Sequence, residues 1–379
     1  MKQNKYGPIP GSAIFSGISG KKAIIMAANV RIASVAQGIF KAAKETDSAL
    51  FMELARSECD LKGGYTGLTP RDFSKKMKEA AKAVQFDTWA LHADHITIKK
   101  GDSSEIEGTK QLIDAQIAAG YTSFAIDASH LFNFEGKTVK EELKENIQVA
   151  SDLAHYIKNK MRGQDFGLEV EVGEIGRKDG EGLILTKPEE AVGFIKALNE
   201  NDVYPHVLAI ANGSTHGHTY DANGNVVEQL SIDIPRTKEI AKALRANNLK
   251  VGIAQHGITG TPRDLINLHF PKGDIIKGNV GTFWQDVVFS TLKVYEPVLY
   301  RDIQEWTLEK YRSANPGKKD RQIFDGNCKF AIKEFYKEIY SVHEDTEHAI
   351  QAMAYAESLV FFKAFSSQGT ASLVRKSSR

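Results

Sequence analysis

The sequence predicts an α/β fold, a (β/α)8 TIM barrel with a helical C-terminal extension. Between residues 23 and 281, short apolar and β-branched runs alternate with longer amphipathic segments, which is typical of a parallel sheet covered by helices. Eight such units follow one another, and a barrel of eight units takes roughly 250 residues. After residue 300 the sequence is charged and helix-forming, without a comparable strand candidate. A doubly wound open sheet is the alternative fold.

The eight expected strands are short apolar runs, most of which end in polar residues or glycine. In chain order they cover residues 23–29, 49–55, 88–94, 123–129, 168–173, 206–213, 250–256 and 274–281. Helical stretches separate them, such as SVAQGIFKAAKE after the first strand and PRTKEIAKALRAN after the sixth.

These elements predict two parts of the chain. We expect a catalytic barrel over residues 1–300 and a helical extension over residues 301–379. The extension would pack on the barrel or on a neighbouring subunit. Its last stretch, TASLVRKSSR, is expected to be a frayed tail.

The composition favours a protein that acts on a small molecule. Its 49 basic and 48 acidic residues give a formal net charge of +1, so the chain lacks the basic excess that binds nucleic acid or an anionic membrane. The N-terminal stretch contains no continuous apolar segment, and no window approaches the roughly 20 apolar residues of a membrane span. Two cysteines, Cys59 and Cys328, fit a reducing compartment. We therefore expect a cytoplasmic protein without nucleic-acid or membrane partners.

Polar side chains gather where the expected strands end, which in a barrel is the face that carries chemistry. In chain order they are Asn29, Glu53, Asp94, His95, Asp127, Glu171, His216, His256 and Asn279. Three imidazoles (His95, His216 and His256) and the Glu171 carboxylate form a ligand set suited to Zn2+. Any one of these histidines alone would more readily be explained as a hydrogen-bonded core or loop residue. Four placements at the same end of four strands favour a metal site.

The stretch WALHADHI, residues 89–96, brings three titratable groups to the end of one strand. Asp94 is expected on the opposite side of the strand from His95, free to accept or donate a proton. The alternative is that Asp94 orients a ligating histidine. His92 shares the side of Asp94 one step deeper and is expected in the core or behind the ligands.

Glycine-rich loops follow the last three strands at residues 212–217, 256–262 and 278–282. Backbone N–H groups exposed by glycine at a helix N-terminus bind phosphate, and barrels commonly do so after strands seven and eight. Glycine also serves plain turns, but the shared location favours a small phosphorylated substrate. Lys277 lies nearby, where a Schiff base to a carbonyl substrate is chemically possible; we expect a structural or phosphate-contacting lysine instead.

Together these motifs resemble the class II, metal-dependent fructose-bisphosphate aldolase family. LHADHITIKK is similar to the family's stretch with a catalytic aspartate and a metal histidine, and LEVEVG to its glutamate pair. GSTHGHTY, HGITGT and KGNVGT are similar to its other metal histidines and phosphate loops. The resemblance implies that His95, Glu171, His216 and His256 hold Zn2+ and that Asp94 is the acid/base. The substrate-binding residues that it implies are Asn29, Gly217, Gly257, Thr259, Asn279 and Thr282.

The resemblance implies a carbon–carbon lyase of glycolysis and carbohydrate metabolism. Such a zinc-dependent aldolase reversibly cleaves fructose 1,6-bisphosphate to dihydroxyacetone phosphate and glyceraldehyde 3-phosphate through a metal-stabilised enediolate. Asp94 would take the proton of the C4 hydroxyl group. By analogy of fold, the helical extension favours a homodimer or a larger homo-oligomer.

The sequence departs from the family pattern mainly at the aldehyde end of the substrate. GEIGRKDGEG replaces an acidic loop, which leaves Glu174 and Glu181 as alternative proton donors to the enediolate. FDGNC, residues 324–328, replaces a segment that helps to bind the aldehyde-side phosphate, so Arg31 and Arg56 are candidate replacement anion binders. Two alternatives therefore stay open: an aldolase for another ketose phosphate, such as tagatose 1,6-bisphosphate, and a non-catalytic aldolase-like subunit.

Overall fold

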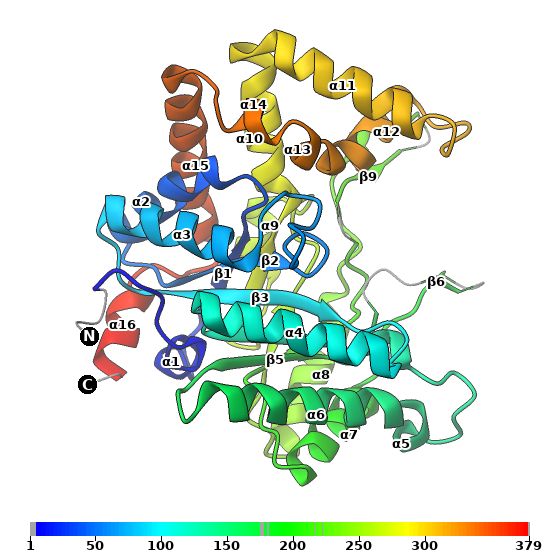
Figure 1. Cartoon of the computed structure of the whole chain (residues 1–379). Coiled ribbons are helices and arrows are strands. Elements are labelled where there is room, and N and C mark those ends of the chain that lie inside the picture. The colour runs from blue at the N-terminus through cyan, green and yellow to red at the C-terminus, as the bar shows by residue number, and fades with distance from the viewer. Residues whose placement is uncertain (1–4, 175–177, 180–181, 216, 222, 378–379) are drawn as a thin grey trace.

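A closed barrel of eight parallel strands forms the centre of the molecule (Figure 1). The computed structural model describes residues 5–174, 178–179, 182–215, 217–221 and 223–377. The barrel strands are β1 (Ile25–Asn29), β2 (Leu50–Ala55), β3 (Trp89–Thr97), β4 (Ser123–Asp127), β5 (Gly167–Glu171), β8 (Val207–Ala209), β11 (Gly252–Gln255) and β12 (Ile275–Val280). Pairing of β12 with β1 closes the sheet, which confirms the predicted barrel and excludes the open sheet. Each strand overlaps one of the eight predicted runs.

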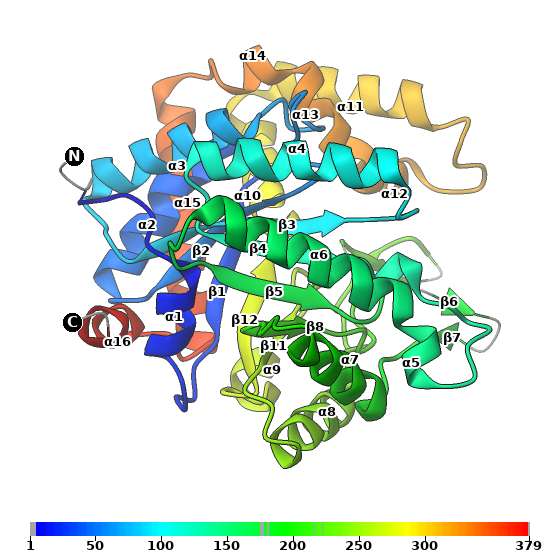
Figure 2. The same ribbon diagram turned by 60° about the horizontal axis from the view of Figure 1, so that its bottom comes forward.

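One main helix follows each barrel strand on the outside. These helices are α2 (Ala36–Glu45), α3 (Pro70–Val84), α4 (Ser103–Ala119), α6 (Lys144–Met161), α7 (Pro188–Glu200), α8 (Ile234–Ala246), α9 (Arg263–His269) and α10 (Thr282–Tyr295). Figure 2 shows α3, α4 and α6 side by side over the strands. Local sequence fixes their ends: Thr69 and Asp72 form a capping box before α3, and Gly120 ends α4 in the left-handed conformation.

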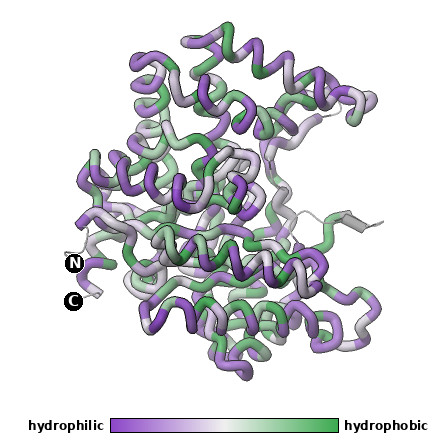
Figure 3. Tube along the Cα trace, in the orientation of Figure 1, coloured by the Kyte–Doolittle hydropathy of each residue, from purple (hydrophilic) through white to green (hydrophobic). Residues whose placement is uncertain are grey.

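Shorter elements lie in the connections. They are η1 (Ala33–Val35), η2 (Ser129–Leu131), α5 (Val139–Glu142), the pair β6 (Lys178–Asp179) and β7 (Gly182–Leu183), and the hairpin β9 (Thr219–Tyr220) and β10 (Val226–Val227). Figure 3 shows apolar and polar residues alternating along the outer helices, as expected for helices with one face on a core. Within the described residues, no helix combines the length and the apolar character needed to span a membrane.

Helix α1 (Gly11–Gly17) closes the amino-terminal end of the barrel. The backbone N–H of Gly11 donates to the carbonyl of Thr122 at 3.0 Å, and the Phe15 ring stacks on Phe51 with centroids 5.0 Å apart. A Cβ atom on Gly11 would lie 2.7 Å from the Cβ of Ser123, so only glycine allows this close approach. The opposite end of the barrel is left for chemistry.

The C-terminal extension packs on the barrel of the same chain. It contains α11 (Pro297–Tyr311), α12 (Asp320–Asn327), η3 (Cys328–Phe330), α13 (Ala331–Glu334), α14 (Tyr336–Ile339), α15 (Glu344–Ala364) and α16 (Thr370–Ser377). Helix α15 lies beside α2, and Gly38 of α2 allows this contact because a Cβ there would lie 2.2 Å from the carbonyl oxygen of Gln351. Ile303, Phe361 and Phe365 belong to the same apolar core as the barrel strands. The extension therefore shares the core of the barrel.

The expected frayed tail is wrong for residues 370–377, which form α16. Ala371 and Val374 are buried, and α16 packs against α1 at the closed end of the barrel. Arg375 donates to the Thr88 hydroxyl at 2.7 Å and to Asp87 at 3.2 Å. Two apolar residues at helical spacing and two tertiary ion pairs, of Arg375 with Asp47 and Asp87, order a segment whose composition alone indicated a solvated end.

Candidate active site

A pocket of about 340 Å3 opens at the carboxyl ends of the barrel strands. Twelve of the predicted site residues line it: Asn29, Arg31, Asp94, His95, Glu171, Glu174, Gly217, His256, Gly257, Thr259, Asn279 and Thr282. They come from strands and loops distributed around the barrel, so the closure of the sheet brings them together.

Three predicted site residues are not found in the pocket. His216 and Glu181 lie outside the described residues. Arg56 turns away from the barrel axis and donates to the Thr97 carbonyl at 2.9 Å and the Thr109 hydroxyl at 2.8 Å. The Arg56 guanidinium therefore ties β2 to β3 and α4, and we no longer count it among the anion binders.

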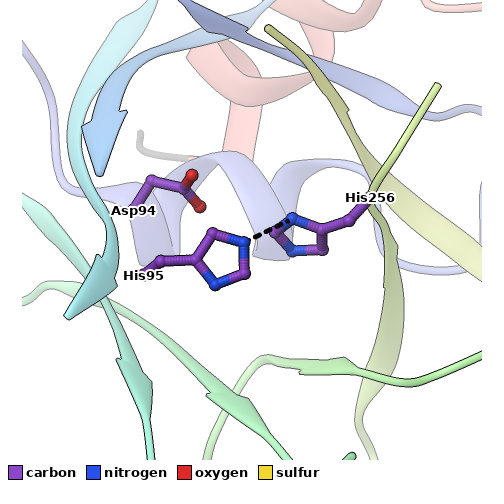
Figure 4. A group of neighbouring side chains, drawn as sticks. All are labelled: Asp94, His95 and His256. Carbon is purple, nitrogen blue, oxygen red and sulfur yellow. Dashed lines mark hydrogen bonds between the residues drawn. The ribbon is translucent and has the colours of Figure 1, made fainter. Parts of the chain in front are cut away.

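Asp94 and His95 both face the pocket, which corrects the expectation that they point to opposite sides of β3. The pairing of β3 with β4 shifts register between Ala93 and Ile96, and His95 has a φ angle of 38°. A bulge of this kind interrupts the alternation of side chains, and a positive φ is unusual for histidine. The bulge turns the His95 ring toward the ring of His256, beside Asp94 (Figure 4).

The two imidazoles face each other through one nitrogen each. His95 Nε2 lies 3.0 Å from His256 Nδ1, and an oxygen of Asp94 lies within 4.8 Å of a nitrogen of each ring. The other nitrogen of each ring meets a carboxylate, since His95 Nδ1 is 3.0 Å from Glu171 and His256 Nε2 is 3.2 Å from Glu169. A carboxylate behind an imidazole fixes its tautomer and leaves the opposite nitrogen available to a metal.

This donor set fits a borderline divalent ion. Tetrahedral Zn2+ binds imidazole nitrogens at about 2.0–2.1 Å, so two such nitrogens lie roughly 3.3 Å apart. The separation of 3.0 Å between the facing nitrogens is close to that value. Glu171 groups with His95 and Asp127 rather than with His256, on the far side of the His95 ring.

Burial and neighbouring charges shift the pKa values of this cluster. Burial, and then the Asp127 carboxylate, raise the pKa of Glu171 to about 8. Burial lowers the pKa of His95, but the Asp94 and Glu171 carboxylates outweigh it and raise that pKa well above its usual value. Burial, and then the charge of His95, lower the pKa of His256. Without a metal, the group of His95, Glu171 and Asp127 therefore retains protons at neutral pH.

Glycine loops and a helix N-terminus form one side of the pocket. Gly257 has a φ angle of 66°, and a Cβ there would lie 2.6 Å from the Thr215 carbonyl oxygen, so the loop requires glycine. The Thr259 hydroxyl accepts a hydrogen bond from the backbone N–H of Phe283 at 3.2 Å, which fixes this loop to the first turn of α10. Thr282 is the first residue of α10. N–H groups at such a helix start favour an anion.

Two cations that the sequence motifs only partly revealed also line the pocket, and one of them, Arg31, lies beside this helix start and donates to the Thr282 hydroxyl at 3.3 Å. The Arg31 guanidinium pairs with Glu58 at 2.9 Å, and the Tyr65 hydroxyl donates to the same carboxylate at 2.6 Å. Lys329, from η3, lies with Nζ 5.8 Å from the centre of the Tyr65 ring, and no ion pair joins it to the described carboxylates. Because Glu58 offsets Arg31, Lys329 leaves this end with an excess positive charge.

Lys277 does not line the pocket. Its side chain is fully buried, and Nζ lies 2.8 Å from Glu169 and 3.1 Å from Glu53. Burial lowers the pKa of Lys277, but these carboxylates outweigh it and raise that pKa. A protonated amine away from the pocket is no nucleophile, which argues against a Schiff-base mechanism. His92 is also fully buried, with Nδ1 2.8 Å from the Ser123 hydroxyl.

Comparisons with known proteins agree with the pocket's chemistry. The family model described as "Fructose-bisphosphate aldolase class-II" matches residues 12–348. A fructose-bisphosphate aldolase of Geobacillus stearothermophilus is 27% identical over 190 residues, covering 48% of this chain and 53% of that protein. One from Nostoc sp. is 28% identical over 268 residues, covering 68% and 66%. The chain thus spans about half to two thirds of the length of these relatives.

Solved structures share the fold at low sequence identity. The YdjI aldolase from Escherichia coli K12 aligns with a TM-score of 0.60 and 17% identity, covering 96% of this chain and 99% of that one. A putative fructose-1,6-biphosphate aldolase from Coccidioides immitis gives 0.55 and 18%, covering 98% and 99%. A probable tagatose 6 phosphate kinase from Sinorhizobium meliloti gives 0.61 and 14%, covering 93% and 96%.

Proposed function

The chain belongs to the class II fructose-bisphosphate aldolase family, and from this premise we propose that it is a zinc-dependent aldolase that reversibly cleaves fructose 1,6-bisphosphate. The products are dihydroxyacetone phosphate and glyceraldehyde 3-phosphate. The observation that carries the proposal is the convergence of Asp94, His95 and His256 in a pocket that is also lined by glycine loops, the start of α10 and the cations Arg31 and Lys329.

The proposed metal ligands are His95 and His256, joined by His216, whereas Glu171, expected as a further ligand, lies 3.0 Å from His95 Nδ1 and would instead orient that ring. The facing nitrogens of His95 and His256 support this assignment, and Gly217, which follows His216 in the sequence, lines the pocket. A divalent ion bound there supplies a Lewis acid that polarises the substrate ketone and stabilises the charge left when the C3–C4 bond breaks.

Asp94 is the proposed acid/base. Its carboxylate accepts a hydrogen bond from Asn279 Nδ2 at 3.2 Å and lines the pocket, which supports a role in taking the C4 hydroxyl proton during cleavage. Glu174 also lines the pocket and is about one third exposed, which supports it as the group that returns a proton to the enediolate.

Two neighbouring regions of the pocket, the glycine loops with the α10 start and the pair of cations beside it, are proposed to hold the two phosphates. Gly217, Gly257, Thr259 and the α10 start at Thr282 would bind the dihydroxyacetone phosphate end, with Asn29 and Asn279 beside the carbon chain. Arg31 and Lys329 would bind the aldehyde-side phosphate. The excess positive charge at that end supports a substrate with a second anionic group.

A panel of ketose phosphates tests the substrate assignment. The proposal predicts that kcat/KM for fructose 1,6-bisphosphate exceeds that for fructose 1-phosphate and for tagatose 1,6-bisphosphate by at least tenfold. A preference for tagatose 1,6-bisphosphate would establish the alternative substrate. If the purified chain binds zinc but cleaves none of them, two alternatives stay open: an aldolase for another ketose phosphate and a non-catalytic aldolase-like subunit. Light scattering of the same sample tests the predicted homo-oligomer, and fractionation of cells tests the predicted cytoplasmic location.

A further inference from the structure

A second polar layer lies inside the barrel beneath the floor of the pocket, and one of its members, Glu53, also borders the pocket. Its members are Lys277, Glu53, His92 and Glu169, which are buried with at most 2% exposure. Each stands two residues before a pocket residue on its own strand, and side chains two apart share one face of a strand. The pocket residues above them are Asn279, Ala55, Asp94 and Glu171, respectively.

Lys277 is the hub of this layer. From β12 its Nζ reaches Glu169 of β5 at 2.8 Å and Glu53 of β2 at 3.1 Å. The same atom lies 3.3 Å from His92 Nε2 and 3.9 Å from Asp94 Oδ1, both on β3. One ammonium group thus connects four of the eight barrel strands.

Such a layer is costly for stability alone. Barrel interiors are filled by layers of Val, Ile and Leu, and buried charges usually stabilise a protein less than well-packed apolar residues of similar volume. The described layer contains two glutamates for one lysine, and removal of that lysine would leave both glutamates without this buried partner. The arrangement calls for a role beyond packing.

The contacts of the layer lead to the reaction centre by two routes. Glu169 meets Lys277 through Oε2 and His256 Nε2 through Oε1, the latter at 3.2 Å. Asn279 Nδ2 donates to Glu53 at 2.8 Å and to Asp94 at 3.2 Å, which joins the layer to the floor of the pocket. The first route ends at the His256 imidazole, which faces His95. The second route ends at Asp94, the proposed acid/base.

We propose that Lys277 is a positioning residue, whose buried ammonium fixes Glu169 and Glu53 and through them orients the His256 ring and the Asp94 carboxylate. It touches neither substrate nor metal. The inference rests on the proposed function, because it assigns Lys277 to the support of groups named there.

Lys277→Met tests this role, since methionine keeps the length of the side chain and removes the charge. We expect kcat for cleavage of fructose 1,6-bisphosphate to fall at least 100-fold while KM changes less than threefold. We also expect the zinc dissociation constant of the metal-free protein, measured by competition with a chromophoric chelator, to rise 10- to 100-fold. Ser123→Ala is the matched control, because it removes a buried polar contact of His92 in the same layer without touching the route to His256 or Asp94. It should leave both quantities within threefold.

A folded Lys277→Met protein with parental kcat and zinc affinity would overturn the proposal and leave Lys277 as a stabilising residue only. If this variant does not fold, the same comparison is made between Glu53→Gln and the pair Lys277→Met with Glu53→Gln, which removes one charge of each sign. Equal zinc affinity and kcat in those two proteins would also overturn it. If the parent protein binds zinc but cleaves no sugar phosphate, the proposed function fails while the zinc comparison still decides the role of Lys277.

Discussion

Asp94 and His95 are consecutive residues, yet both line one pocket. They do so because β3 bulges at these two residues, where its pairing with β4 shifts register. The identities of both residues were predictable from the sequence, since they follow an apolar run at the catalytic end of the barrel. Their relative direction was not, because strict alternation along a strand predicts opposite faces. The positive φ of His95 has no local sequence signal such as glycine or asparagine, and only the pairing with β4 reveals it.

Asp94→Asn tests the acid/base at this scale. The amide keeps the shape of the side chain but cannot take the C4 hydroxyl proton, so kcat should fall by about 100-fold to 10,000-fold. Zinc content, counted by elemental analysis, should remain at the parental level because the facing nitrogens belong to His95 and His256. A variant that cleaves at the parental rate would remove Asp94 from the mechanism.

Lys329 is a proposed site residue that was not predicted from the sequence. It lies in the extension directly after FDGNC, residues 324–328, so the position pointed to the aldehyde-side phosphate, but no motif identified the lysine itself. Lys329→Met should raise KM for fructose 1,6-bisphosphate about tenfold, since it removes one charge-assisted contact to the distal phosphate. KM for fructose 1-phosphate should not change. Lys333→Met is the matched control, because that lysine donates to the carbonyls of Lys62 and Gly64 outside the pocket.

Equal effects of Lys329→Met on the two substrates, or equal effects of the Lys329 and Lys333 variants, would contradict the assignment of Lys329 to the distal phosphate.

At the scale of elements, the strands were predictable because a buried parallel strand is a short apolar run whose ends carry polar residues or glycine. The extension was predictable only as helical. Its contacts with α1 and α2 depend on apolar residues, such as Val374, that have no distinctive spacing in so short a segment. The eight strands were predicted correctly and the tail was not. The strand pattern recurs over a long part of the chain, whereas the tail offers only a short stretch in which a pattern can be recognised.

Val374→Ala tests whether α16 is part of the folded core. Val374 is 1% exposed, and loss of two buried methyl groups should lower the free energy of unfolding by about 2 kcal/mol, measured by urea denaturation. Activity at 25 °C should be unchanged, because α16 lies at the closed end of the barrel. The exposed Lys376 provides the control variant Lys376→Ala. A frayed tail would show no difference between the two.

At the scale of the whole molecule, the buried carboxyl and imidazole groups of the pocket couple stability to pH. Burial raises the pKa of Glu171 to about 8. Burial lowers the pKa of His95, but the carboxylates next to the His95 ring outweigh burial and raise that pKa. Groups with a raised pKa hold their protons more tightly in the folded state. The stabilisation that they provide is complete below their unfolded pKa values and is lost as the pH rises through the folded ones.

The free energy of unfolding of the EDTA-treated protein should therefore fall between pH 6.5 and pH 8, by an amount on the order of a few kcal/mol. His256 and His92, whose pKa values are lowered by burial, are about half protonated in the unfolded chain at pH 6.5, so they offset only a small part of the trend. Urea denaturation at pH 6.5 and pH 8 measures this fall in the free energy of unfolding. The Glu171→Gln variant should show a smaller fall between the two pH values. A metal-free protein that becomes more stable toward pH 8 would contradict this assignment of protons.

The most direct test of the account is retro-aldol cleavage of fructose 1,6-bisphosphate by the purified protein, before and after EDTA, with zinc added back and the bound metal counted. We predict activity that disappears with chelation and returns with about one zinc ion per chain. Cleavage that persists after complete removal of the metal would contradict the central claim, that His95, His256 and their neighbours hold a catalytic divalent ion beside Asp94.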